Sequence, residues 1–158
     1  MSETGAFVIR AVEREEVDRV HALWLAAGDR DAWMPASDGA DLLAELDVLA
    51  PEGRVWAAFQ SRRPVAFAAA GELDGALWLS ALGVDRSLRG RGVARSLLAA
   101  AIGYGQWAYY PALLTLAPRG HAEFLERFGF LRLDGDRLEG GLRALSDARR
   151  LSAWARRL

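Results

Sequence analysis

The stretch that decides the fold is LGVDRSLRGRGVARSLL, residues 82–98. A short apolar run ends at Val84, a turn rich in glycine and arginine follows, and an amphipathic helix begins directly after it. Backbone N–H groups at the start of a helix have no intrahelical partner, and together with the helix dipole they attract anions. Glycine lets the backbone approach a phosphate closely, and arginine adds permanent positive charge. The residues that we assign to these two roles are Arg89, Gly90, Arg91, Gly92 and Arg95.

The stretch therefore predicts a strand, an anion-binding turn and a helix N-terminus in succession. The alternative is a glycine-rich turn that binds nothing, but such a turn has no need of three arginines. Other phosphate-binding loops are excluded by the residues themselves. The stretch has no Gly-x-Gly-x-x-Gly pattern, and because the chain has no lysine it cannot contain a Walker loop.

Composition limits the chemistry further. The 158 residues, of which 52% are hydrophobic, suit one globular domain over residues 1–158. All 20 basic residues are arginine and cysteine is absent, which excludes Schiff-base lysines, thiolate nucleophiles and thiolate metal sites. The net charge of −1 argues against a nucleic-acid partner. With neither a secretory signal nor a membrane-spanning apolar run, we expect a cytoplasmic protein.

Periodicity and turn residues outline the remaining elements. We expect strands over residues 6–10, 54–60, 64–72, 76–84, 112–117 and 130–133. We expect helices over residues 13–27, 38–49, 92–109 and 119–128. The C-terminal segment 136–158 is atypical: residues 137–145 are only weakly strand-like, and residues 146–157 are predicted to be helical.

The run Arg89-Gly90-Arg91-Gly92-Val93-Ala94 resembles motif A of the GNAT superfamily, the acyl-CoA-dependent N-acyltransferases. A second block, residues 122–130, is similar to a late helix of that family, with matches at Phe124, Gly129 and Phe130. The order of predicted elements is also the GNAT order over residues 6–134. The resemblance implies an α/β (α+β) fold with a mixed, mostly antiparallel sheet flanked by helices.

The resemblance also implies a binding site for acetyl-CoA or another short acyl-CoA. Its residues in this chain are Leu82, Gly83, Val84, Arg89, Gly90, Arg91, Gly92, Val93, Ala94 and Arg95. By resemblance, a backbone N–H near Val84 polarises the thioester carbonyl as an oxyanion hole does. Gly83 is expected to ease the irregularity of the strand there.

Two family acid–base positions are changed in this chain. The tyrosine that often protonates the leaving thiolate falls at Leu125, and a glutamate found in some relatives falls at Trp78. His121, at the start of the late helix, is the candidate for proton transfer because imidazole titrates near neutral pH; the alternative is a histidine with no catalytic role. Glu72 and Asp74 either draw a proton through water, bind a cationic acceptor, or are solvated turn carboxylates.

The acceptor site is expected near the loop of residues 30–37 and near Trp78. Trp33 and Met34 either line an apolar acceptor pocket, together with Trp78, or cover the core or an oligomer contact such as a homodimer interface. The tail arginines form either a solvated helix face or a surface that attracts an acidic group. They are Arg143, Arg149, Arg150, Arg156 and Arg157.

These expectations favour an N-acetyltransferase that moves an acetyl group from acetyl-CoA directly to a primary amine of a small molecule or peptide. The alternative from a different class is a GNAT-fold module that binds acyl-CoA with little or no turnover. The changes at Leu125 and Trp78 keep that alternative open.

Overall fold

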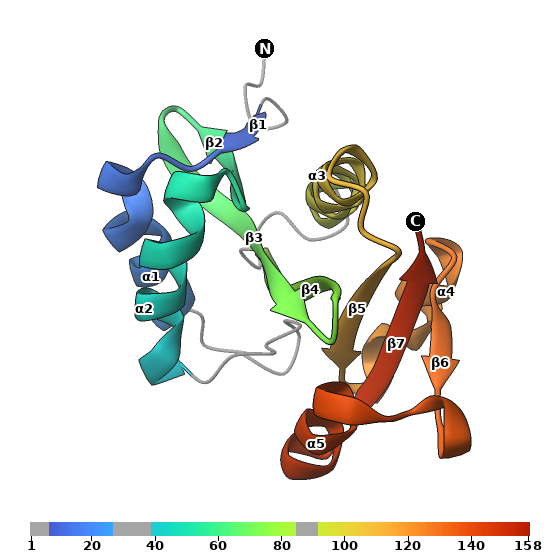
Figure 1. The fold of residues 1–158 in the computed structure, drawn as a ribbon. Coiled ribbons are helices and arrows are strands. Elements are labelled where there is room, and N and C mark those ends of the chain that lie inside the picture. The colour runs from blue at the N-terminus through green and yellow to red at the C-terminus, as the bar shows by residue number, and fades with distance from the viewer. Residues whose placement is uncertain (1–6, 27–38, 85–91) are drawn as a thin grey trace.

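The structure is a computed structural model that describes residues 7–26, 39–84 and 92–158. A seven-stranded sheet runs through these residues in the order β1-β2-β3-β4-β5-β7-β6 (Figure 1). All neighbouring strands are antiparallel except β4 and β5, which are parallel. The strands are β1 (Val8–Ala11), β2 (Val55–Gln60), β3 (Arg63–Leu73), β4 (Ala76–Val84), β5 (Ala112–Ala117), β6 (Leu131–Leu133) and β7 (Ser152–Arg157).

Within the described residues, five α-helices cover this sheet. They are α1 (Val17–Ala26), α2 (Gly39–Leu49), α3 (Val93–Trp107), α4 (Ala122–Arg127) and α5 (Gly140–Arg149). Helices α1 and α2 pack together on one face of the strands β2 to β4, and α3 packs on the other (Figure 1). The predicted α/β class with a mixed, mostly antiparallel sheet flanked by helices is confirmed, and the limits of β4 and β5 agree with the predicted ones.

Alternation along β4 reverses part-way, and this reversal shapes the centre of the molecule. Leu77 and Leu79 face the α3 side, and so do Leu82 and Val84. In a regular strand, odd-numbered and even-numbered residues face opposite sides, so the strand is irregular between Leu79 and Leu82. The reversal arises because Ala69 pairs with Ala81 and Ala70 with Leu79, which leaves Ser80 as an extra residue. Such a β-bulge bends the strand and interrupts regular pairing.

The C-terminal segment differs from its prediction. The helix expected over residues 146–157 is wrong, because α5 (Gly140–Arg149) comes earlier and Ser152–Arg157 forms strand β7 between β5 and β6. Leu138, Leu142 and Leu145 have helical spacing and pack in one cluster with residues of β4, β5 and β7. Ala153 and Trp154 alternate between the two faces of the sheet, as strand residues do.

A tertiary cap fixes the start of α5. The carboxylate of Asp74, in the turn between β3 and β4, accepts hydrogen bonds from the backbone N–H groups of Gly141 and Leu142, both at 3.0 Å. A Cβ at Gly141 would lie 2.9 Å from the end of the Leu73 side chain and 3.1 Å from Asp74 Oδ1, so the close approach favours glycine. Asp74 is therefore an N-cap supplied from elsewhere in the chain, and it ties α5 to the base of β4.

Candidate functional site

The candidate site is the place where the parallel strands β4 and β5 part. They are in register only at two positions, Leu77 with Leu113 and Trp78 with Leu114. Beyond Trp78 the described part of β5 offers β4 no further partner, although both strands continue, to Val84 and Ala117. Separated strands leave backbone N–H and C=O groups that an extended ligand can pair with. We call this region the wedge: residues 79–84 of β4 and 115–117 of β5.

Two buried hydroxyl groups hold the narrow end of the wedge. Ser80, the bulged residue, donates from Oγ to the carbonyl of Ala69 on β3 at 3.3 Å. Thr115 donates from Oγ1 to the carbonyl of Leu79 on β4 at 3.2 Å. Both hydroxyl residues are completely buried. The bulge is therefore bracketed from both neighbouring strands, which fixes the point at which β4 leaves β5.

The bulge in β4 comes earlier in the strand than the irregularity expected from the sequence. That irregularity was expected to be eased by Gly83, with the polarising N–H near Val84, but both residues pair regularly with β3, at Phe67 and Ala66. The bulge is therefore not at Gly83, although this glycine lies in the part of β4 that has separated from β5. The bulge is at Ser80, a position that no local sequence pattern marks, because the register shift is set by pairing with β3.

The wide end of the wedge leads to the N-terminus of α3. Gly92 precedes the helix with φ +78°, a left-handed conformation that suits glycine, and a Cβ there would meet no atom within 4 Å. The first helical hydrogen bond runs from the Ser96 N–H to the Gly92 carbonyl. The N–H groups of residues 93–95 thus have no intrahelical acceptor, and no side chain of the described residues caps them.

The predicted helix start is present at residues 92–95, and anion binding there stays a prediction. Val93 is buried, Ala94 is half-buried and Arg95 is exposed, so the arginine side chain is free to reach outward. Leu82, Gly83 and Val84 form the end of β4, as expected. The remaining predicted cradle residues, Arg89, Gly90 and Arg91, lie outside the described residues, as do Trp33 and Met34.

His121 is the N-cap residue of α4, and its N–H donates to the Pro118 carbonyl at 3.1 Å. It follows the end of β5 by four residues, so it lies on the wide side of the wedge. Leu125 stands about one helical turn further along α4 and is completely buried among the apolar residues of the α3 face. The family tyrosine position is therefore a packed core position in this chain.

Trp154 is a feature that the sequence did not single out. It lies on β7 in register with Thr115, is only 5% exposed, and belongs to the same apolar cluster as Leu125. Its indole Nε1 is buried and has no hydrogen-bond partner among the described residues. An unpaired buried N–H costs about 1–3 kcal/mol, so a ligand that supplies an acceptor gains from it.

The acidic candidates have structural partners. Asp74 caps α5, and Glu72 accepts a hydrogen bond from the Tyr110 hydroxyl at 2.8 Å. Arg54 donates in turn to the Tyr110 oxygen at 2.8 Å. Burial raises the pKa of Tyr110, and so does its hydrogen bond to Glu72, so the phenol stays protonated. Both carboxylates are exposed to solvent, and each also holds a structural hydrogen bond.

Trp78 lies at the last position where β4 pairs with β5, and it is 8% exposed. It packs with Leu114 and Leu116 of β5 and with Leu142 of α5. Its ring edge comes close to Gly71, where a Cβ would lie 3.9 Å from Cδ1. The residue thus forms the floor of the wedge on the face opposite to α3, next to the helix that Asp74 holds in place.

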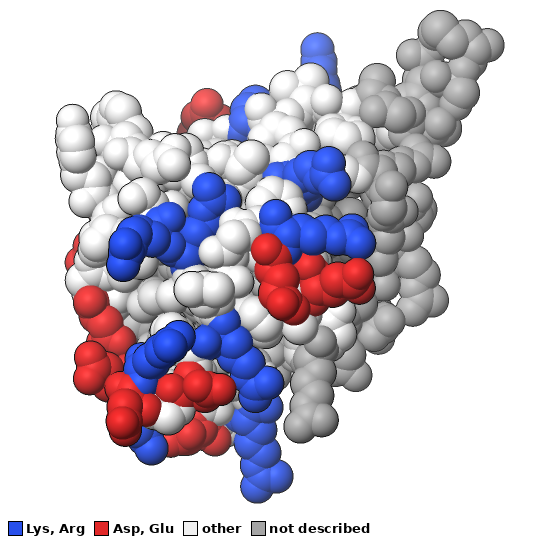
Figure 2. Space-filling view, turned by 90° about the vertical axis from the view of Figure 1, so that its right-hand side faces the viewer, with Lys and Arg blue, Asp and Glu red and all other residues white. Residues whose placement is uncertain are grey.

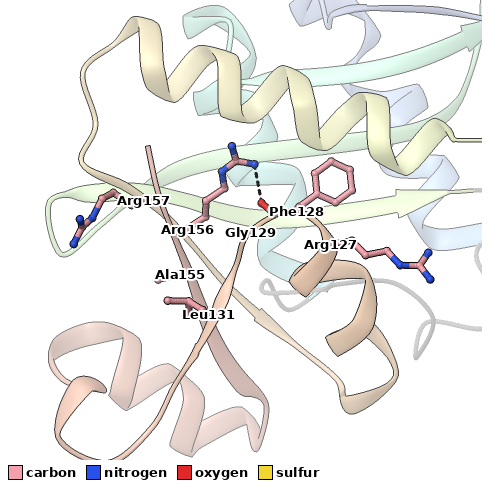
Figure 3. A pocket seen from close by; sticks show the side chains of 7 residues that line it. All are labelled: Arg127, Phe128, Gly129, Leu131, Ala155, Arg156 and Arg157. Carbon is pink, nitrogen blue, oxygen red and sulfur yellow. Dashed lines mark hydrogen bonds between the residues drawn. The ribbon is translucent and has the colours of Figure 1, made fainter.

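A concavity of about 700 Å³ lies beside the far end of β7, lined by Arg127, Phe128, Gly129, Leu131, Ala155, Arg156 and Arg157 (Figure 3). Arg156 Nη1 donates to the Phe128 carbonyl at 2.7 Å. The three guanidinium groups point in different directions, so they do not converge on one anion. Because Arg157 pairs with Ala112, the first residue of β5, this concavity is at the closed end, away from the wedge.

The tail arginines are not one helix face, which corrects the interpretation from sequence. Arg143 and Arg149 belong to α5, Arg150 ends that helix with φ 56°, and the other two belong to β7. Acidic and basic side chains are interleaved on this side of the molecule (Figure 2). Arg143, for example, lies 3.9 Å from Asp147 in an exposed pair. Such a surface has no single strong charge.

The sequence model of the acetyltransferase (GNAT) domain matches residues 51–132, more than half of the chain. The chain belongs to the GNAT acetyltransferase family. The matched region includes β4, the wedge and the N-terminus of α3, together with the first residues of β6. Among curated proteins, no sequence matches the chain significantly.

Solved GNAT structures share the fold of this family member at low identity. Neisseria gonorrhoeae N-acetylglutamate synthase, complexed with coenzyme A and N-acetyl-glutamate, is 17% identical with a TM-score of 0.76; the match covers 97% of this chain but 35% of that one. Drosophila melanogaster polyamine N-acetyltransferase, which forms N-acetylagmatine, is 17% identical with a TM-score of 0.73, over 97% and 100% of the two chains. A mosquito arylalkylamine N-acetyltransferase-like protein is 12% identical with a TM-score of 0.75, over 97% and 100%.

The described residues contain no group of three or more histidine, aspartate or glutamate side chains able to hold a metal ion. None of their helices is both long enough and apolar enough to cross a bilayer.

Proposed function

We propose that this GNAT protein transfers an acetyl or another short acyl group from acyl-CoA directly to a primary amine of a small molecule or peptide. The observation that carries the proposal is the wedge, with a bulge at its narrow end and an uncapped helix N-terminus at its wide end. The neighbours whose names give an acceptor act on amines, which supports the same acceptor class.

The length of the wedge suits the pantetheine arm of coenzyme A. With the diphosphate at the N–H groups that begin α3, the arm enters beside Val84 and runs along β4. From Val84 to Leu79 the strand rises five residues, about 17 Å at about 3.3 Å each. The arm has about as many chain bonds as four to five extended residues, so it spans about 15 Å. The thioester therefore reaches the bulge at Ser80.

At the bulge, the chain holds the thioester in place and polarises its carbonyl with backbone N–H groups. A bulge turns N–H groups away from the regular ladder, and such groups can donate to the thioester oxygen as charge develops on it. The amine nitrogen forms the new C–N bond, the C–S bond breaks, and the thiolate leaves with the electron pair. The amine loses one proton, for which we propose His121, acting through water from the wide end.

A thiol-release assay with acetyl-CoA and a panel of amines tests the proposal. The panel should include amino acids, polyamines, arylalkylamines and peptides with free N-termini. We expect saturable thiol release with at least one amine. The variant Gly92→Asp should show no thiol release with that amine. That variant places a carboxylate where the diphosphate belongs.

The second candidate is an acyl-CoA-binding module with little turnover, which the buried Leu125 favours because leucine has no proton to give. The two functions give different results. A module shows CoA binding and thermal stabilisation without thiol release for any amine. Absence of CoA binding contradicts both.

A further inference from the structure

We propose that the indole N–H of Trp154 is the hydrogen-bond donor to the sulfur of the bound coenzyme A, a role that rests on the proposed function. The donor is built into the sheet beneath the wedge and needs no proton transfer. It makes Trp154 a binding residue for the leaving thiolate in a chain that has leucine at the family tyrosine position.

Trp154 lies at the same depth along the strands as the expected position of the sulfur. The pantetheine arm is long enough to place its sulfur near Leu79 and Ser80, at the narrow end of the wedge. Thr115 marks the same level on β5, because its hydroxyl touches the Leu79 carbonyl. Trp154 marks it on β7, because it is the register partner of Thr115. Leu79, Thr115 and Trp154 are thus lateral neighbours on β4, β5 and β7, at the level where the sulfur is expected.

Trp154 also lies on the same face of the sheet as the narrow end of the wedge. Leu79 and Trp154 belong to the apolar cluster on the α3 face, and Leu125 of α4 packs in that cluster too. Opposite residues of paired strands have Cβ atoms about 4.5–5.5 Å apart, so the large indole lies beside the short Thr115 side chain. The Trp154 ring therefore shares the level and the face of the wedge apex.

Trp154 carries a buried hydrogen-bond donor that has no acceptor within residues 7–26, 39–84 and 92–158. The residue is only 5% exposed, and the donor is its Nε1. Buried indole N–H groups usually find an acceptor. Thiolate is an anionic acceptor that appears only when the C–S bond breaks, so this bond strengthens as charge develops on sulfur.

The test compares equilibrium binding of CoA and desulfo-CoA, which lacks the sulfur, by isothermal titration calorimetry between neutral and alkaline pH. Wild-type protein is expected to prefer CoA by about tenfold once the bound thiol ionises, as a hydrogen bond to a charged group implies. Trp154→Phe should lose this preference while its affinity for desulfo-CoA stays within about twofold.

Two further variants separate the hydrogen bond from packing. Replacement of Trp154 by β-(3-benzothienyl)alanine keeps the ring shape and removes only the N–H, so it should also lose the preference even if Trp154→Phe fails to fold. Trp56→Phe changes an indole of the same apolar cluster on β2 and should keep it.

The outcomes distinguish this role from the proposed function. If wild-type protein binds CoA with the preference and the benzothienyl variant retains it, Trp154 is structural and the inference fails alone. If wild-type protein binds CoA and desulfo-CoA equally at every pH, the inference also fails. If CoA does not bind at all, the proposed function fails and this role fails with it.

Discussion

Replacement of Thr115 by valine removes one hydroxyl at the narrow end of the wedge and nearly preserves the shape of the side chain. Thr115 is completely buried, and its Oγ1 donates to the Leu79 carbonyl at 3.2 Å. Loss of this bond leaves a buried carbonyl unpaired, at a cost of about 1–3 kcal/mol. For a domain of this size each kcal/mol lowers the melting temperature by about 2–4 °C. A central value of about 2 kcal/mol therefore predicts a fall of about 4–8 °C.

The same change should act on catalysis, because the hydroxyl sets where β4 leaves β5. Misplacement of reacting groups by about 1 Å can cost about 100-fold in rate, so we expect kcat to fall by about tenfold or more. Thermal unfolding followed by circular dichroism gives the first number, and thiol release at saturating acetyl-CoA gives the second.

Ser146→Ala is the matched control. Ser146 is also buried, and its Oγ donates to the Leu151 carbonyl at 2.6 Å, but it lies at the end of α5 rather than in the wedge. It should lower the melting temperature without the loss of kcat. If Thr115→Val unfolds at the wild-type temperature with full activity, or if both variants lose activity equally, the reasoning about the wedge apex is refuted.

Four other outcomes follow from the structure. Saturation with CoA at 100 times its Kd should stabilise the protein by about 2.7 kcal/mol in thermal shift, and Gly92→Asp should abolish this stabilisation while leaving the free protein folded. Leu125→Tyr should lower the melting temperature with no gain in kcat, because a phenol overfills a completely buried site at a cost of about 1–3 kcal/mol; a raised kcat would show that thiolate protonation limits turnover. His121→Ala should lower kcat/KM by at least about tenfold and remove the acidic limb of its pH profile, with unchanged CoA affinity; an unchanged profile would make His121 structural. Glu16 accepts two hydrogen bonds from Arg10, at 2.8 and 2.7 Å, which lower its pKa from 4.5 to about 2. The free energy of unfolding, measured at graded pH, should therefore decrease as the pH falls from about 4.5 through about 2. Glu16→Gln should flatten that pH dependence.

Much of this fold follows from local patterns. Apolar periodicity and turn residues are enough to place β4, β5 and the long helix after Gly92 within one or two residues. The tail prediction is wrong because helical spacing joins residues on both sides of the boundary between α5 and β7: Ala148, Leu151, Ala155 and Leu158. The helical spacing of Leu138, Leu142 and Leu145 was the signal that could have placed α5 correctly.

The site divides in the same way. Glycine and the helix start predict an anion site from sequence because their effects are local. The bulge at Ser80, the cap from Asp74 and the unpaired Trp154 N–H depend on residues brought together by the sheet, far apart in sequence. No periodicity encodes such contacts, and they decide where the wedge begins.

Hydrogen–deuterium exchange with and without saturating CoA tests the central claim most directly, because it locates the ligand as well as detecting it. The account predicts slower exchange in three segments: residues 79–84 of β4, residues 115–117 of β5 and the first turn of α3. The concavity beside Arg156 and Arg157 should show no change. Protection that is absent from the wedge, or confined to that concavity, would contradict the account.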